Sequence, residues 1–351
     1  MIEIPKDLGY YMPAEWEKHS AVWLAWPYGI ITFPDNLKEV EEDYCEIIKI
    51  LQKSEKVKLI VLNNKEKERI ENKLLKHKVN LEKVELYIEN YADVWTRDYA
   101  PITLFNKNKK DRAFVKWNYN AYGRKDDPVF VDLLKDDKVF FHILDKKKNK
   151  IFKPDIVLEG GAIESNGRGT ILTTEQCLLN KNRNKELDKG RTEIYLKAYL
   201  GAENVIWLKE GLVNDHTDGH IDEVARFVNS NTIVCSYESN KKDPNYFILN
   251  DNFNILKNAK DKNGKKFKII KLPMPHMNYD TGEKAPVSYA NFYIGNSIIL
   301  MSIFNDPNDK KAMDIVASLF PDRKVIGIDC SKIIYGGGAI HCMTMQEYFK
   351  R

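Results

Sequence analysis

The feature that most constrains the fold is a repeated order of predicted elements. Two short apolar strands, an amphipathic helix and a further strand follow one another about five times along the 351 residues. The repeat lies in element order and hydrophobic pattern, because no sequence identity between units is obvious. Such repeats are typical of radial or stacked arrays, whereas a doubly wound sheet alternates single strands with helices. We therefore predict an α/β chain of ββαβ units.

The second unit shows how the pattern is assigned. It is predicted as strands at Ile102–Leu104 and Ala113–Trp117, a weak helix at Val129–Leu134 and a strand at Val139–Ile143. A chain of this length often holds two or three domains. Because no linker rich in Gly, Ser or Pro separates two halves, we expect residues 1–351 to form a single domain.

Composition argues against several classes of protein. Lys and Arg number 55 against 51 Asp and Glu, and the lysine clusters are small, so we expect no nucleic-acid partner. No apolar run approaches the roughly 18 residues of a membrane span, and the N-terminal residues lack a secretory signal pattern. The five cysteines include no C-x-x-C pair, which argues against a disulfide framework or structural zinc. These features predict a cytoplasmic protein.

A candidate nucleophile lies in the string YGGGAIHCMT. The glycines Gly336, Gly337 and Gly338 permit close backbone approaches that side chains would block. Cys342 follows them, and a cationic neighbour or substrate would favour its reactive thiolate. The alternative is a small core residue, as most free cysteines are. His341 adjoins Cys342, but neighbours on an extended chain point to opposite faces, so we interpret His341 as structural.

The string NDHTDGHIDE contains the candidate acid/base. If this segment is extended, His216, Asp218, His220 and Asp222 would share one face. Two functions are compatible with such a face: a metal site, or a general acid/base His220 beside a charge-reading Asp222. A structural turn network is a third interpretation. Because neither HxH nor HExxH spacing is present, we favour the acid/base.

Two further strings supply hydrogen-bond acceptors. VWTRD holds Trp95, whose flat face suits a planar cation, and Asp98, whose two oxygens match a fork of N–H donors. LEGGAIE holds Glu159, which could orient a catalytic histidine as the third group of a triad does. The alternative for VWTRD is a structural ion pair of Arg97 with Asp98 or Asp93.

Together these residues supply a nucleophile, an acid/base and three carboxylates. An ordinary cysteine hydrolase needs N–H donors around its oxyanion, whereas a surplus of acceptors favours a cationic substrate rich in donors. A singly substituted guanidinium has five N–H donors. The sequence therefore predicts deimination: Cys342 attacks the guanidinium carbon, His220 protonates the departing ammonia, and water then releases a urea product.

Six ordered strings resemble the agmatine deiminase family. They are MPAEWEKHSAVWLAWP, VWTRD, EGGAIE, TDGHID, SYANFYIGN and GGGAIHC, and they extend over nearly the whole chain. The resemblance implies the five-bladed, pseudo-symmetric α/β propeller of the guanidine-modifying enzymes (the pentein superfamily), with the active site on a central axis. It implies agmatine as substrate, N-carbamoylputrescine and ammonia as products, and a place in putrescine and polyamine biosynthesis. It also implies no metal, no organic cofactor and a homo-oligomer, either dimer or tetramer.

The resemblance also assigns roles by motif. It implies that Cys342 is the nucleophile, that His220 is the acid/base and that Glu159 is a carboxylate supporting His220. It also implies that Asp98 and Asp222 are the guanidinium ligands and that Trp95 lines the pocket. One position departs from the family, which usually has Asn where this chain has Ala339, and the change removes an amide near the nucleophile. The alternatives are a deiminase of arginine, methylarginine or peptidylarginine, an amidinotransferase, and a non-catalytic guanidinium-binding protein.

Overall fold

The computed structural model describes residues 3–29, 32–106, 108–145 and 147–349, and the strands of these ranges form five sheets of a mixed α/β fold. In sheet order, the strands are β1 (Tyr10–Tyr11), β5 (Ile102–Asn106), β6 (Asp111–Val115) and β7 (Ile151–Phe152); β10 (Asn204–Leu208), β9 (Thr170–Thr174) and β8 (Ile163–Ser165); β11 (Ala225–Asn229), β12 (Thr232–Tyr237) and β13 (Lys268–Pro273); β14 (Tyr293–Ile294), β15 (Ile298–Ile303) and β16 (Lys324–Asp329); and β17 (Met345–Tyr348), β2 (His19–Ala25), β3 (Lys56–Val61) and β4 (Val84–Ile88).

Every one of these sheets combines an antiparallel pair with a parallel pair. In the third sheet, β11 runs antiparallel to β12, and β12 runs parallel to β13. A parallel pair needs a crossover, which is usually a helix. The crossover helices are α1 (Leu37–Leu51), α4 (Asp136–Ile143), α6 (Lys189–Leu200), α7 (Tyr246–Asn258) and α8 (Asp309–Leu319). The predicted order of two strands, a helix and a strand therefore agrees with the topology.

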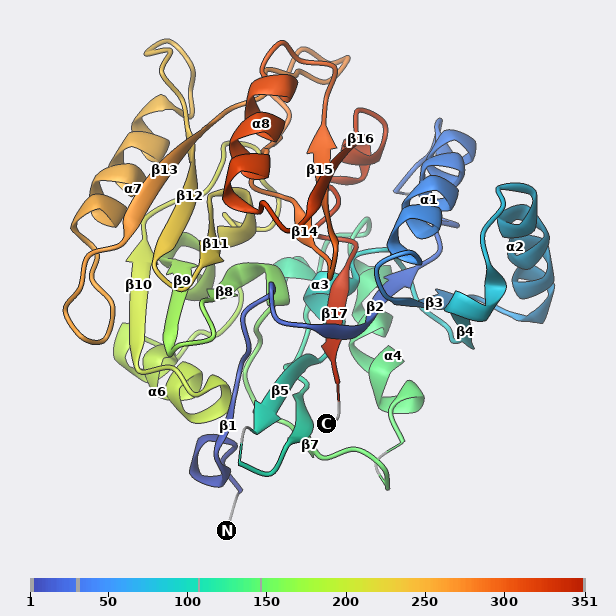
Figure 1. The fold of residues 1–351 in the computed structure, drawn as a ribbon, viewed down its shortest axis with the longest axis horizontal. Coiled ribbons are helices and arrows are strands. Elements are labelled where there is room, and N and C mark those ends of the chain that lie inside the picture. The colour runs from blue at the N-terminus through green and yellow to red at the C-terminus, as the bar shows by residue number, and fades with distance from the viewer. Residues whose placement is uncertain (1–2, 30–31, 107, 146, 350–351) are drawn as a thin grey trace.

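The fifth sheet joins distant parts of the chain. β17 pairs antiparallel with β2, and β2 pairs parallel with β3. One further helix, α2 (Asn64–Lys76), connects β3 to β4. Figure 1 shows the helices α1, α2, α6, α7 and α8 toward the outside of the molecule, while the short α3 (Thr96–Tyr99) and β17 lie near its middle.

Local sequence explains where these helices lie and end. In α1, side chains at helical spacing are buried, among them Val40, Tyr44, Ile47 and Leu51. Directly after α6, Gly201 takes a left-handed φ of 69° and closes the last turn of the helix.

The prediction of a strand at Val139–Ile143 is wrong. This segment is the second half of α4, and β7 completes the second unit in its place. The helix buries Val139 and Phe140, while its first residue, Asp136, accepts a hydrogen bond from the Asp93 N–H at 3.2 Å. A short apolar run fits a helix or a strand equally well, so tertiary contacts decide between them.

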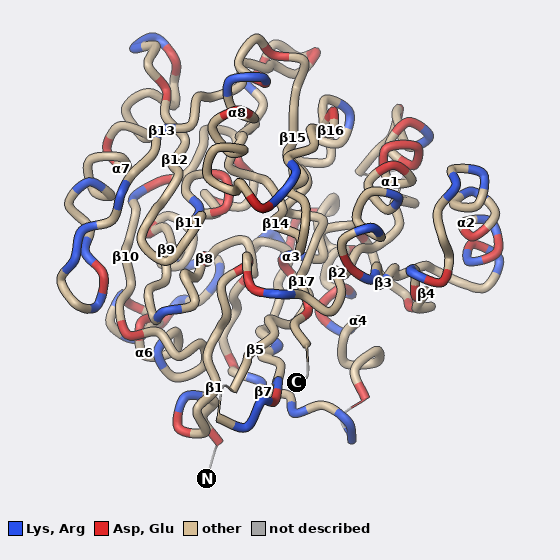
Figure 2. Tube along the Cα trace, viewed as in Figure 1, with Lys and Arg blue, Asp and Glu red and all other residues tan. Residues whose placement is uncertain are grey.

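The largest hydrophobic core cluster contains the nucleophile candidate, because Cys342 belongs to it together with side chains of α1, β3 and β15. Figure 2 shows acidic and basic residues intermixed over the molecule, in line with the balanced composition. In the described part of the chain, every helix is too short or too polar to cross a bilayer.

The predicted polar motifs occupy equivalent places in the units. Asp98 lies in α3, directly before β5; Glu159 precedes the turn η5 (Gly160–Ala162) and then β8; and Asp222 lies in the turn η6 (Ile221–Glu223), before β11. Cys342 comes shortly before β17. The turns η5 and η6 contact one another, and α3 contacts η5, so these motifs meet in the interior of the protein.

Candidate active site

Cys342 lies in a tight loop between the turn η7 (Ile333–Gly336) and β17, with only 8% of the residue exposed. Gly337 takes a left-handed φ of 94°, a conformation that favours glycine. A Cβ at Gly338 would lie 2.7 Å from Trp95 and 3.0 Å from the Cβ of Cys342. The glycines therefore let the indole ring of Trp95 pack directly against the nucleophile loop.

Arg97 holds this loop in place. Its backbone N–H donates to the carbonyl of Cys342 at 3.1 Å, and its Nε donates to the carbonyl of His341 at 3.2 Å. The neighbouring hydroxyl of Thr96 donates to the carbonyl of Met343 at 2.9 Å. The arginine of the VWTRD string thus binds the loop that carries the sulfur instead of forming an ion pair with Asp98.

Asp222 brings a carboxylate to the sulfur. Its Oδ2 lies 4.0 Å from Cys342 Sγ and 2.7 Å from Nδ1 of His341, whose Nε2 faces Glu15 at 2.8 Å. Burial opposes ionisation of Asp222, but the hydrogen bond and charge of His341 outweigh it and lower its pKa. Asp222 Oδ1 is buried and accepts no hydrogen bond from the described residues, so it remains open to a ligand. Both nitrogens of His341 have carboxylate partners, which leaves neither for proton transfer.

Asp98 faces the same space from another sheet. Its Oδ1 accepts the N–H of Gly161 at 2.9 Å, and its Oδ2 accepts the hydroxyl of Tyr122 at 2.9 Å. Burial raises the pKa of Asp98 to about 6, against the opposing charge of His220. Tyr122 is held at a left-handed φ of 57°, which is unusual for a residue with a side chain and is typical of functional sites.

His220 lies beside Asp98, with Nδ1 3.7 Å from Oδ1 of that residue. Burial lowers the pKa of His220, but the charges of Asp98 and Asp222 outweigh burial and raise it well above its ordinary value. The imidazole therefore carries a proton at neutral pH, and it can donate that proton to a leaving group.

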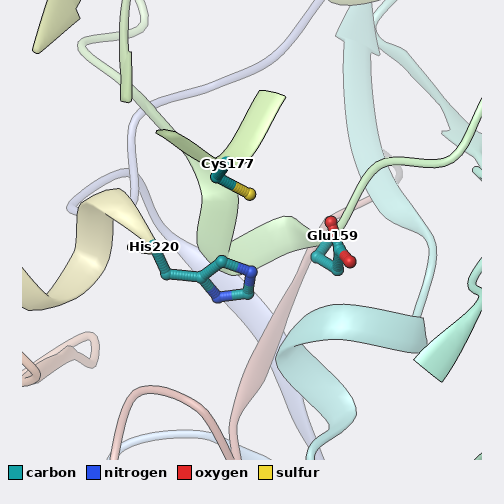
Figure 3. A group of neighbouring side chains, drawn as sticks. All are labelled: Glu159, Cys177 and His220. Atoms are coloured by element: carbon teal, nitrogen blue, oxygen red, sulfur yellow. The ribbon is translucent and has the colours of Figure 1, made fainter. Parts of the chain in front are cut away.

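Glu159 also lies close to the His220 ring. Figure 3 shows the ring directed toward Glu159 and Cys177, and the ligand atoms of these three residues lie within 4.8 Å of one another. The hydrogen-bond partner of Glu159 is Arg183, whose Nε donates to Oε1 at 2.6 Å. Arg183 also donates to the carbonyl of Thr217 at 2.8 Å. Glu159 is thus tied to the turn before His220, and no direct hydrogen bond joins it to that ring among the described residues.

Two buried groups have the spacing of metal ligands: Glu159, Cys177 and His220; and Asp222, Glu223 and Cys342. In the first group the cation beside Glu159 is the Arg183 guanidinium, which already neutralises that carboxylate. The second group surrounds the candidate nucleophile, where a divalent cation would compete with any cationic substrate.

The expectation of an extended segment with His216, Asp218, His220 and Asp222 on one face is wrong. Gly219 takes a left-handed φ of 83° and turns the chain, and η6 follows directly. The carboxylate of Asp218 accepts a hydrogen bond from Asn182 at 2.8 Å, whereas Asp222 faces the sulfur. His220 and Asp222 still meet beside Gly161, whereas Asp218 does not join them.

A cavity of about 820 Å³ leads outward from Trp95 and Tyr122. Trp95 contacts the nucleophile loop, and Tyr122 donates a hydrogen bond to Asp98. His216 forms part of its wall, and burial lowers the pKa of that ring to about 4, so it is neutral. The charged residues of the lining are Asp93, Asp132, Lys135, Asp280 and Glu283.

Two residues that sequence reasoning missed also reach the sulfur. Asn291 Nδ2 donates to Cys342 Sγ at 3.1 Å and to Glu223 Oε1 at 2.7 Å, and Glu223 Oε1 lies 3.8 Å from the same sulfur. Asn291 belongs to the string SYANFYIGN and comes shortly before β14. Its place before the first strand of a unit matches those of Asp98, Glu159 and Cys342, and this repeat was the signal that could have identified it.

The family model of the Porphyromonas-type peptidyl-arginine deiminases matches residues 11–347 of the chain. This chain belongs to that family. The predicted resemblance to the agmatine deiminases is confirmed, and so is the predicted class of enzyme, a hydrolase acting on C–N bonds.

Relatives of this deiminase cover it almost completely. A Legionella pneumophila protein named "Putative agmatine deiminase" is 38% identical over 345 residues, which are 98% of this chain and 96% of the relative. A Latilactobacillus sakei protein of the same name is 34% identical over 361 residues, with 97% of each chain covered. The structure of an agmatine deiminase of Enterococcus faecalis has a TM-score of 0.91 at 29% identity and covers 99% of this chain and 98% of its own. That of a C. jejuni agmatine deiminase with substrate bound has a TM-score of 0.84 at 28% identity, with coverages of 97% and 96%.

Gly161 of this deiminase provides a test of whether His220, Asp98 and Asp222 act together. A Cβ there would lie 2.5 Å from Nδ1 of His220, 2.8 Å from Oδ1 of Asp98 and 3.1 Å from Oδ2 of Asp222. We expect Gly161→Ala to displace these side chains and to remove most turnover, at a stability cost of about 1–3 kcal/mol. The measurements are kcat and KM beside the thermal unfolding midpoint.

Gly190→Ala is the matched control, because Gly190 lies in α6 with its nearest neighbour at 3.5 Å and should gain stability from the better helix former. Turnover of Gly161→Ala equal to that of the unmodified enzyme would mean that the three side chains do not act together.

Proposed function

We propose that this protein is an agmatine deiminase that hydrolyses agmatine to N-carbamoylputrescine and ammonia. The observation that carries the proposal is a buried set of carboxylates around the Cys342 sulfur, next to an acidic cavity that Trp95 and Tyr122 line. Such a set suits a ligand with a guanidinium at one end and an ammonium at the other. The relatives from Legionella pneumophila and Latilactobacillus sakei are named for agmatine as well.

The guanidinium head would lie between Asp98 and Asp222. Both residues are almost fully buried, at 4% and 0% exposure, and a charged acceptor is worth most in such a water-poor site. Trp95, only 3% exposed, would offer a face to the planar cation. The plane of the head and the position of its carbon relative to Cys342 would then be fixed together.

Binding of the cation would also activate the nucleophile. Burial and then the charges of Asp222, Glu223 and Asp98 raise the pKa of the Cys342 thiol well above its ordinary value, so the free enzyme holds a thiol. A guanidinium placed among those carboxylates offsets their charge and favours loss of the thiol proton. The N–H of Asn291, 3.1 Å from Sγ, stabilises the thiolate that results.

The reaction then proceeds in two steps. The thiolate of Cys342 adds to the guanidinium carbon, and the C–N bond breaks as His220 gives its proton to the departing ammonia. Water adds to the remaining S-alkylthiouronium carbon while the neutral His220 takes one of its protons. The C–S bond breaks, which returns the sulfur and releases the urea product. Glu159 and its partner Arg183 would hold the turn and the ring of His220 in place during both steps.

The cavity lining favours an ammonium tail over the α-carboxylate of arginine. Among the described lining residues, four carboxylates, at Asp93, Asp132, Asp280 and Glu283, stand against one cation, at Lys135. Lys135 is moreover engaged, with Nζ 3.6 Å from Oδ2 of Asp132. A carboxylated tail would meet like charges there, whereas an amine tail meets opposite ones.

The architecture and setting proposed here follow from the same reasoning. The five sheets would be the blades of a pseudo-symmetric propeller formed by one domain over residues 1–351. We propose a cytoplasmic homo-oligomer, a dimer or tetramer, acting in putrescine and polyamine biosynthesis without a metal or organic cofactor.

The test is ammonia release from agmatine, arginine, a methylated arginine and a peptidyl arginine at equal concentrations. We expect kcat/KM for agmatine to exceed the other values by at least about tenfold, the effect of roughly 1.4 kcal/mol in favour of the amine tail. A higher value for peptidyl arginine or arginine would overturn the substrate assignment, and the absence of turnover with every compound would favour a non-catalytic guanidinium-binding protein.

A further inference from the structure

A third carboxylate faces the candidate nucleophile, and none of the predicted roles uses it. Glu223 ends η6 directly after Asp222, and 6% of the residue is exposed. Its Oε1 lies 3.8 Å from Cys342 Sγ and accepts the Nδ2–H of Asn291 at 2.7 Å. Its Oε2 is buried and accepts no hydrogen bond from any described residue.

The contact with Asn291 does not explain why this residue is acidic. The amide N–H of Asn291 needs one acceptor oxygen, which a neutral glutamine would supply equally well. A buried carboxylate with one free oxygen is costly unless a donor reaches that oxygen. Glu223 Oε2 and Asp222 Oδ1 are both buried acceptors without partners in the described structure. One oxygen of each of these carboxylates lies within 4.8 Å of the other and of the sulfur, so the pair suits a ligand that brings several N–H donors and a positive charge.

The groups around Glu223 include an excess of negative charge. They are Asp222 in its own turn, Asp215 and His220 in the preceding loop, Cys342 in the nucleophile loop, and Tyr279 in the segment after β13. Burial and then the charges of Asp222 and Asp215 raise the pKa of Glu223 well above its ordinary value, although His220 opposes them. The free enzyme therefore holds Glu223 as a neutral acid over a wider pH range than an exposed glutamate.

We propose that Glu223 is an additional ligand of the guanidinium head, accepting an N–H of the substrate on Oε2 beside Asp222 Oδ1. The inference rests on the proposed function, since it places a guanidinium next to Cys342. It goes beyond the predicted pair of ligands, Asp98 and Asp222, by giving the head a third carboxylate on the side of the nucleophile. When the cation binds, the carboxyl proton of Glu223 passes to solvent, and the carboxylate then pairs with the cation.

The test variant is Glu223→Gln, in which Asn291 fixes the orientation of the new amide. Because the Asn291 N–H must face the amide oxygen, the amide NH₂ takes the place of Oε2 and presents donors to the donors of the guanidinium. Loss of a charged acceptor is worth roughly a ten- to hundredfold change in affinity. We expect Glu223→Gln to weaken binding by that factor, and Glu223→Asp, which keeps the charge on a shorter stem, to weaken it less.

Affinity would be measured by calorimetry in the full-length Cys342→Ala protein, which cannot turn the ligand over. The probes are agmatine and methylguanidinium, which has the head without the tail. Glu223→Gln should weaken binding of both probes, whereas Glu283→Gln, at the cavity rim, should leave methylguanidinium binding unchanged. In the Cys342→Ala background, affinity for methylguanidinium should rise as pH rises through the raised pKa of Glu223, where the side chain loses its proton, and Glu223→Gln should flatten that rise. Thermal unfolding midpoints identify any variant that fails to fold.

Equal affinity for methylguanidinium before and after the Glu223→Gln exchange would overturn the inference and leave Glu223 as an anchor for Asn291. This result is distinguishable from failure of the proposed function. If the unmodified enzyme prefers another guanidino compound to agmatine, the head is still a guanidinium, and the methylguanidinium comparison still decides the role of Glu223. If no guanidinium compound binds at all, both proposals fail together.

Discussion

Replacing Cys342 by alanine should abolish ammonia release from agmatine while the protein still folds. The sulfur is the nucleophile in the proposed reaction, and its contacts are with Asp222 and Glu223, whereas the thiol of Cys177 lies beside Glu159 and His220. Loss of a catalytic nucleophile lowers kcat by a factor on the order of 10⁶. Deletion of one buried sulfur atom should cost only about 1 kcal/mol or somewhat more of folding stability.

The measurement combines steady-state turnover with mass spectrometry of acid-quenched reactions. The unmodified enzyme should show an adduct on the peptide that carries Cys342, and the alanine variant should show none. Cys235→Ala, in the buried strand β12, is the control and should keep its activity. Turnover by Cys342→Ala within about tenfold of the unmodified enzyme would exclude covalent catalysis at this residue, because a missing nucleophile costs far more than that.

Replacing His220 by glutamine should lower kcat by roughly 10²–10⁴-fold, the usual contribution of a positioned proton donor. His220 is the group that gives a proton to ammonia and later takes one from water, and its Nδ1 lies 3.7 Å from Asp98. Glutamine fills a similar space and can donate a hydrogen bond, but it cannot transfer a proton at neutral pH. The loss should therefore fall on kcat more than on KM.

The pH profile of kcat separates this role from a structural one. In the unmodified enzyme, kcat should fall as pH rises through the raised pKa of His220, because the proton donor is lost. That descending limb should be absent from the glutamine variant. His276→Gln is the control, since His276 is 48% exposed on its side chain and pairs with Glu238. An unchanged descending limb in His220→Gln would assign the limb to another group.

The positions of many site residues could be predicted because these residues occupy equivalent places in the repeated units. Asp98, Glu159, Asp222 and Cys342 each stand shortly before the first strand of a unit, and short strings of unusual composition mark those places. The convergence of positions far apart in sequence then followed from an array of similar units. Element order alone was enough for this part of the prediction.

Other parts depended on contacts that no local pattern encodes. Glu223 is one residue away from Asp222, and nothing in the string HIDE indicates that both side chains reach the sulfur. Arg183 lies in a polar string that looks like a solvated loop, yet it is buried against Glu159. Gly219 turned the segment before His220 away from the expected extended form. Tertiary packing decided the first two cases, whereas the turn at Gly219 is a local effect of glycine.

The cavity rim and the reacting centre are built from different parts of the chain, and this separation bears on divergence. Asp132, Asp280 and Glu283 stand on exposed segments, whereas Asp98, His220 and Cys342 are locked into the interior. Exchanges at exposed positions usually alter folding free energy by less than about 0.5 kcal/mol. A lineage descended from this protein can therefore acquire a preference for a different guanidino compound by drifting at its surface, one residue at a time, while the inherited chemistry stays intact.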